Sequence, residues 1–217
     1  MMRRGFPTRL FGLAAALLLV SCAVTPPQRV PGINPEQAWA ARRERLAAVQ
    51  GWNLSGRIAL YTQDSAWTAT VAWQQRGEDY DLRLSGPLGQ GAAELRGDRE
   101  GVIMRTADGG VYFAPDASSL ISRQFGWRVP VAGLRYWVLG SPDPAAPAHE
   151  ELDGYGRLSR LQQSGWDIKF LGYTRAGGLE LPDKIFLNDR HFHVRLVIDH
   201  WVLAPSASAG TKKPLTK

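Results

Sequence analysis

The chain has 217 residues, of which 44% are hydrophobic and 21% are charged, which is the composition of a folded globular domain. Its net charge of +6 comes from 26 Lys and Arg against 20 Asp and Glu, and no basic stripe stands out, which argues against nucleic-acid binding. A single cysteine excludes an internal disulfide.

The first residues have the pattern of a secretory signal. Arg3, Arg4 and Arg9 precede an apolar run over residues 10–20, which is too short to span a bilayer comfortably. The run ends in Leu-Val-Ser before Cys22, an ending that resembles a lipobox. We therefore expect a lipoprotein signal peptide over 1–21 and lipidation of Cys22. An ordinary cut after Ser21 and an uncleaved anchor are the alternatives.

A lipidated N-terminal tether is expected next, over 22–35, because its prolines and Gly32 prevent regular structure. Asn34 and Pro35 then form a typical helix start, and Gly51 a typical end. The sequence thus predicts a helix over roughly 35–49. The residues expected on one face of it are Trp39, Arg43, Leu46 and Val49.

After this helix, apolar residues recur at every second position, which is typical of antiparallel strands with one buried face. Strands with short turns between them favour a meander that curls to bury that face. The ranges expected to form strands are 52–61, 67–73, 80–85, 91–96, 101–106, 110–114, 157–163, 166–173, 183–188 and 191–202.

The middle of the chain is predicted to be helical over 117–125 and 131–139, with a proline-rich loop over 141–147. These short helices could cover the curled sheet and leave room for an apolar ligand. We expect one domain over 36–203 and a flexible C-terminal tail over 204–217.

Enzyme motifs are missing from the sequence. It contains no Gly-x-Ser-x-Gly, phosphate loop or His-Glu-x-x-His, and His191 and His193 lack a clear third metal ligand. We therefore predict no catalytic residue, no metal site, no cofactor and no enzymatic activity.

An unusual loop follows the third expected strand. Gly86, Pro87 and Gly89 predict a sharp turn, and Leu88 lies at its tip, where polar residues are normal. Leu88 could fold back onto the core, or it could stay exposed and touch lipid or a partner.

Taken together, these features resemble the LolB family of outer-membrane lipoprotein receptors. The resemblance covers nearly all of residues 36–203. Besides the lipobox, it rests on Trp52, Leu54, Gly56–Ala59, Trp73, Tyr80, Leu82, Leu84, Gly86–Gly89, Pro130–Val131, Leu134, Trp137–Val138, Gly140, Leu152–Asp153, Gly156–Leu158, Gly165–Trp166, Ile168, Tyr173, Leu181–Pro182, Ile198 and Trp201.

The resemblance implies a mainly β (α+β) fold: a half-open antiparallel β-barrel of about ten to eleven strands, with a helical lid enclosing an apolar cavity. It also implies a protein lipid-anchored at the periplasmic face of the outer membrane. There it would accept acylated lipoproteins from a soluble, LolA-like periplasmic carrier and insert their acyl chains into outer-membrane phospholipid. Leu88, in the loop Gly86–Gly89, would assist membrane insertion. We expect a monomer.

In that mechanism, inward-facing residues of the sheet and lid would line the cavity, although a dry core would require the same alternation. An alternative function is a lipid-anchored structural or assembly component of the cell envelope. The candidate cavity residues are Trp52, Leu54, Ile58, Trp73, Leu82, Leu134, Trp137 and Phe170.

Overall fold

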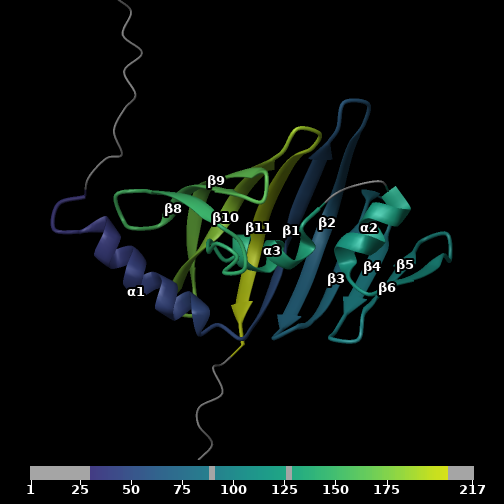
Figure 1. Ribbon diagram of the computed structural model, residues 1–217, viewed down its shortest axis with the longest axis horizontal. Coiled ribbons are helices and arrows are strands. Elements are labelled where there is room, and N and C mark those ends of the chain that lie inside the picture. The colour runs from purple at the N-terminus through teal and green to yellow at the C-terminus, as the bar shows by residue number, and fades with distance from the viewer. Residues whose placement is uncertain (1–29, 88–90, 126–128, 205–217) are drawn as a thin grey trace, which may run out of the picture.

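The structure is a computed structural model that describes residues 30–87, 91–125 and 129–204 (Figure 1). This part of the chain forms three helices and eleven strands. The helices are α1 (Pro35–Ala47), α2 (Ala117–Phe125) and α3 (Val131–Trp137). The strands are β1 (Gly51–Tyr61), β2 (Ala66–Arg76), β3 (Asp79–Ser85), β4 (Ala93–Gly97), β5 (Val102–Thr106), β6 (Val111–Ala114), β7 (Ala148–Leu152), β8 (Leu158–Gln163), β9 (Trp166–Ala176), β10 (Leu179–Asn188) and β11 (His193–Leu203).

All eleven strands belong to one antiparallel sheet, in the order β6-β5-β4-β3-β2-β1-β11-β10-β9-β8-β7. Strands that follow each other in the chain are neighbours, except β6 and β7, and the pairing of β1 with β11 joins the two halves of the sheet. The outermost strands β6 and β7 are not paired with each other, so the barrel stays open. Side chains of β2 and of β8 and β9 nevertheless meet in one apolar core, because the sheet is curled. The expected half-open antiparallel barrel with a helical lid is confirmed.

In the sequence, Trp201 breaks the apolar alternation of the last strand, and an irregularity in the pairing of β1 with β11 explains the break. The register shifts between Ser55 and Gly56, so that Asp199 has no partner in the ladder. Before this bulge the even-numbered residues of β11 point inward, and after it the odd-numbered residues do. Trp201 therefore packs edge-on against Trp52 with ring centroids 5.5 Å apart. Gly56 is required there, since a Cβ atom would collide with the backbone of Val197.

The first helix begins as expected but ends earlier. Asn34 accepts hydrogen bonds from the backbone N–H groups of Glu36 and Gln37, and the helix ends at Ala47. Gly51 is the first residue of β1 and not the end of the helix. Arg43, expected on the same face as Trp39, is exposed and has its guanidinium 5.9 Å from the Trp39 ring, and Arg42 is the arginine that is buried together with Trp39 and Leu46.

Two parts of the sheet differ from the expected strands. β7 was not predicted, because Ala-His-Glu-Glu-Leu lacks a clear apolar face. β10 begins at Leu179, four residues before the expected start, and contains Pro182. Proline is tolerated there because the ladder with β9 is irregular around Pro182 and Lys184.

The helices α2 and α3 lie over the concave side of the sheet (Figure 1). Leu120 of α2 packs with Leu95, Val102 and Met104 in a small second core beside the main one. Trp137 of α3 is buried in the main core, and the helix ends there, two residues before the expected end. We call α2 and α3 the lid.

Candidate functional site

The structure brings all eight predicted cavity residues to one apolar interior. Five are buried in the main core, and Ile58, Leu82 and Leu134 are partly buried against it. Trp52 and Trp73 pack edge-on with ring centroids 5.0 Å apart. The lid supplies Trp137, which has no exposed surface. In this conformation the predicted wall residues of the sheet and Trp137 of the lid belong to one packed apolar core.

Gln163, which the sequence did not single out, holds the end of the lid. Its side-chain Oε1 accepts from Trp137 Nε1 at 2.7 Å and from the Asp143 N–H at 2.9 Å. Its Nε2 donates to the carbonyl oxygens of Asp143 at 2.9 Å and Ala146 at 2.8 Å. All of its hydrogen-bonding capacity is used although the residue is 3% exposed. One glutamine thus fixes both Trp137 and the loop after α3 to β8.

A second polar contact joins the lid to the opposite half of the sheet. Arg135 of α3 lies 2.9 Å from a carboxylate oxygen of Glu78, in the turn between β2 and β3, and donates to the Tyr136 hydroxyl at 2.9 Å. Burial alone would lower the pKa of Arg135, but the hydrogen bonds to Glu78 and Tyr136 outweigh it and the pKa is raised. Both partners are partly in water, so the contact is weak.

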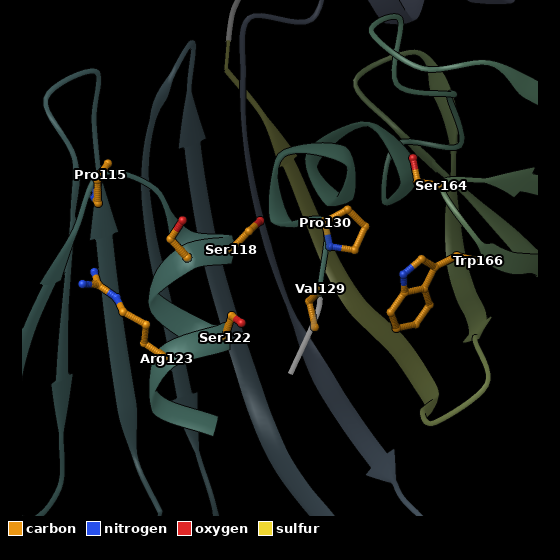
Figure 2. A pocket seen from close by; sticks show the side chains of 9 residues that line it. Pro115, Ser118, Ser122, Arg123, Val129, Pro130, Ser164 and Trp166 are labelled. Atoms are coloured by element: carbon orange, nitrogen blue, oxygen red, sulfur yellow. The ribbon is translucent and has the colours of Figure 1, made fainter. Parts of the chain in front are cut away.

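A hollow of about 770 Å³ lies where the sheet is open, between α2 and the turn that joins β8 to β9 (Figure 2). Ser118, Ser122 and Arg123 give its α2 side a polar surface, and Trp166 lies on the opposite side. Trp166 in turn lies 6.3 Å, centroid to centroid, from Trp137 of the lid. Trp166 therefore lies between this hollow and the buried Trp137.

A larger hollow of about 1150 Å³ lies at the other end of the strands, between the end of α1 and the end of α3. Trp52 is part of its lining, so it borders the predicted cavity wall. Arg43, Arg76 and Arg135 line its polar part. None of the other seven predicted wall residues lines either of these two hollows.

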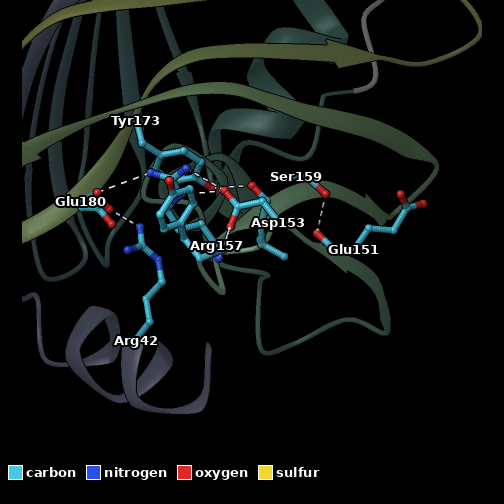
Figure 3. A network of polar contacts seen from close by, with 9 residues as sticks. Arg42, Glu151, Asp153, Arg157, Ser159, Tyr173 and Glu180 are labelled. Carbon is cyan, nitrogen blue, oxygen red and sulfur yellow. Dashed lines mark hydrogen bonds and ion pairs between the residues drawn. The ribbon is translucent and has the colours of Figure 1, made fainter. Parts of the chain in front are cut away.

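A polar cluster ties α1 to the sheet (Figure 3). Arg157 pairs with Asp153 at 2.8 Å and lies 4.6 Å above the ring of Tyr173, whose hydroxyl donates to the Leu158 carbonyl at 2.6 Å. Arg42 bonds the Glu180 carbonyl from the α1 side. Burial lowers the pKa of Arg42 and raises that of Tyr173. Apart from Arg42 Nε, which is buried without a hydrogen-bond partner, these charged and hydroxyl groups contact structural partners, so the cluster supports the fold.

The two other predicted sites are only partly described. Gly86 is buried and Pro87 is exposed, while Leu88 and Gly89 lie outside the described residues, as does Cys22. Among the described residues, no cluster of three or more metal-binding side chains occurs. None of the helices in residues 30–87, 91–125 and 129–204 has the length and apolar character to cross a bilayer.

The fold and the closed apolar interior define a class of proteins in which a curled antiparallel sheet packs under a helical lid. A solved structure of a LolA superfamily protein from Nitrosomonas europaea has this fold, with a TM-score of 0.53 and 7% identity over 79% of this chain and 94% of that one.

Sequence relatives are more specific. The family profile "Outer membrane lipoprotein LolB" matches residues 50–201. "Outer-membrane lipoprotein LolB" of Nitrosococcus oceani is 41% identical over 90% of this chain and 98% of its own length. The protein of the same name from Pseudomonas putida is 37% identical over 85% of this chain and 90% of its own. The chain belongs to the LolB family, which confirms the resemblance and gives it an outer-membrane location.

Proposed function

We propose that this protein is the outer-membrane receptor that takes lipoproteins from a LolA-like periplasmic carrier and delivers their acyl chains to the outer membrane. The observation that carries the proposal is an apolar interior, rich in tryptophan, closed by a short helix that few polar contacts hold. The eight predicted wall residues would line the space that the acyl chains occupy once α3 moves away.

The lid is the part of the molecule that can open at the lowest cost. α3 has seven residues, and its N-cap Pro130 makes no side-chain capping bond, so the helix has little stability of its own. The strands, in contrast, are paired along both edges throughout the centre of the sheet. Displacing α3 breaks the Trp137–Gln163 and Arg135–Glu78 contacts but no pair of strands.

Acyl chains supply enough free energy to replace the lid. Each buried CH₂ group is worth about 0.8 kcal/mol, so one long chain gains on the order of 10 kcal/mol. Exposing Trp137 and breaking its hydrogen bond costs a few kcal/mol. Transfer in this scheme follows a gradient of affinity from carrier to receptor to bilayer. It involves no covalent step, so we propose that the protein is not an enzyme.

Delivery requires a contact with phospholipid, and we assign this contact to the loop Gly86–Gly89, with Leu88 at its tip. We also propose that an acyl anchor on Cys22 holds the protein at the membrane. This assignment is supported by the exposure of Pro87 just after β3 and by the glycines and proline of the sequence, which favour a sharp turn. We further propose that one copy of the chain is sufficient for the activity.

A charge placed on this loop tests the delivery step. Leu88→Glu is expected to leave uptake from the carrier intact and to reduce insertion into liposomes at least about tenfold, because a carboxylate opposes entry into hydrocarbon. Ser65→Glu, in the exposed turn between β1 and β2, is the matched control and should insert lipoprotein normally. Unimpaired insertion by Leu88→Glu would remove the loop from the mechanism.

A further inference from the structure

The outer face of strands β5 and β6, at the open edge of the sheet, carries an exposed apolar patch. Val111 is 52% exposed and Phe113 is 67% exposed, and both point to the same side of β6 because they are two residues apart. Ile103 of β5 lies directly opposite Phe113 in the register and is partly exposed. Other large exposed apolar residues of the described chain, such as Leu171 and Tyr155, lie on separate elements.

Arginines border the apolar residues. Arg105 is exposed and lies opposite Val111. Farther along the same face, Arg83 and Arg96 are ion-paired with Asp81 and Glu94. Arg105 makes no ion pair with any described residue, and Glu94, opposite it in the ladder, pairs with Arg83 and Arg96. We call Ile103, Arg105, Val111 and Phe113 the edge patch.

The edge patch is too small for a stable protein partner. Specific protein interfaces bury about 800 Å² on each side, far more than four side chains can supply. Strand addition to β6 is also hindered, since Arg123 reaches from α2 and donates to the Phe113 carbonyl oxygen at 2.9 Å. Apolar side chains next to an unpaired arginine suit a lipid surface instead, where phosphate groups accept the guanidinium.

The position of the patch favours the same partner. An outer-membrane lipoprotein is held near the bilayer, so even a weak second contact is populated at the high local concentration of lipid. The N-terminal anchor leads into α1, and α1 and β6 lie at opposite ends of the molecule (Figure 1). Contacts at both ends would set the orientation of the domain, which a single tether cannot do.

We propose that the edge patch is a membrane-contact surface that lays the open edge of the sheet against the lipid headgroups. This inference goes beyond the proposed transfer activity and does not depend on it. It depends only on the outer-membrane location of the chain.

Site-specific labelling tests this contact in the full-length, lipidated protein. With the thiol of Cys22 consumed by lipidation, Phe113→Cys provides a single site for an environment-sensitive fluorophore. The protein is reconstituted in vesicles of phosphatidylethanolamine and phosphatidylglycerol that contain nitroxide-labelled lipid. Leu171→Cys is the matched control, because Leu171 is 53% exposed on the outer face of β9.

We expect the nitroxide lipid to quench the label at position 113 and to leave the label at 171 unquenched. Adding Val111→Ser and Arg105→Gln should lower the fraction in contact about tenfold. Equal quenching at both positions, or none at 113, would overturn the proposal. A change in the emission of the label at 113 that grows with protein concentration but does not depend on the nitroxide lipid would also overturn the proposal. It would indicate contact with a second copy of the chain. Lipoprotein uptake, measured on the same variants, should be unchanged, which separates this test from that of the transfer activity.

Discussion

Buried tryptophans account for much of the interior, and each of their indole N–H groups needs an acceptor. Trp73 donates to Gln75 at 3.1 Å, Trp201 to the Pro182 carbonyl at 2.8 Å, and Trp137 to Gln163 at 2.7 Å. Gln75 and Gln163 are both buried, and each follows a buried apolar residue on the inward face of its strand, Trp73 and Leu161 respectively. The pairing of a buried glutamine with a tryptophan therefore stabilises the interior while leaving the lid attached by a breakable bond.

Replacing Gln163 by leucine should be strongly destabilising. The change leaves Trp137 Nε1 and the Asp143 N–H without a partner in a buried site, and each such group costs about 1–3 kcal/mol. We expect a loss of about 3 kcal/mol in the free energy of unfolding, measured by urea denaturation of the unlipidated Cys22→Ala protein. The neighbouring Gln162→Leu is the control, since Gln162 is exposed, and should change the stability by less than about 0.5 kcal/mol. Similar denaturation midpoints for the two variants would contradict this role of Gln163.

At the scale of elements, α3 differs from the strands around it. It is short, lacks a side-chain cap, and touches the sheet through Trp137 on one side and Arg135 on the other. Its apolar residues were visible in the sequence, but its attachments were not. Glu78 and Gln163 lie in distant turns and strands that only the curl of the sheet brings to the lid.

Neutralising Glu78 should make the lid open more easily. Glu78→Gln removes a partly exposed ion pair worth about 0.5–1 kcal/mol, so uptake of a fluorescent fatty-acid analogue should become about two- to fivefold faster. Asp199→Asn removes the exposed pair with Arg57, outside the lid, and should leave the uptake rate unchanged. Both variants should unfold within about 1 kcal/mol of the parent. Equal uptake rates for the two variants would show that the Arg135–Glu78 contact does not restrain the lid.

For the whole molecule, the sequence predicted the helices and strands in which apolar residues recur at a regular spacing. It missed those that are defined by contacts with distant parts of the chain. The alternating residues of β1, β2 and β9 identified strands, and Asn34 identified a helix start. The polar strand β7 and the proline-containing start of β10 carried no such signal, because their pairing depends on neighbours elsewhere in the chain. The bulge opposite Gly56 could not be predicted from the sequence either, although its effect, the break in alternation at Trp201, was visible there.

The candidate site was predictable to the same degree. Alternation located the six wall residues of the strands in one interior, and Leu134 and Trp137 of the lid joined them, but the pattern could not distinguish a filled core from a cavity, since both bury the same positions. The described conformation has the lid inserted between them. The proposed function thus requires that acyl chains replace the lid in contact with these residues.

The most direct test is quenching of tryptophan emission in the Cys22→Ala protein by an acylated lipopeptide whose chains carry bromine. The account predicts saturable quenching at about one lipopeptide per protein, no quenching by the same lipopeptide without bromine, and a larger loss of quenching in Trp73→Phe than in Trp39→Phe. Trp73 lies in the predicted wall, whereas Trp39 is on α1 and bonds Glu150 of β7. If the lipopeptide bound without quenching the interior tryptophans, the acyl chains would lie elsewhere and the central claim would be wrong.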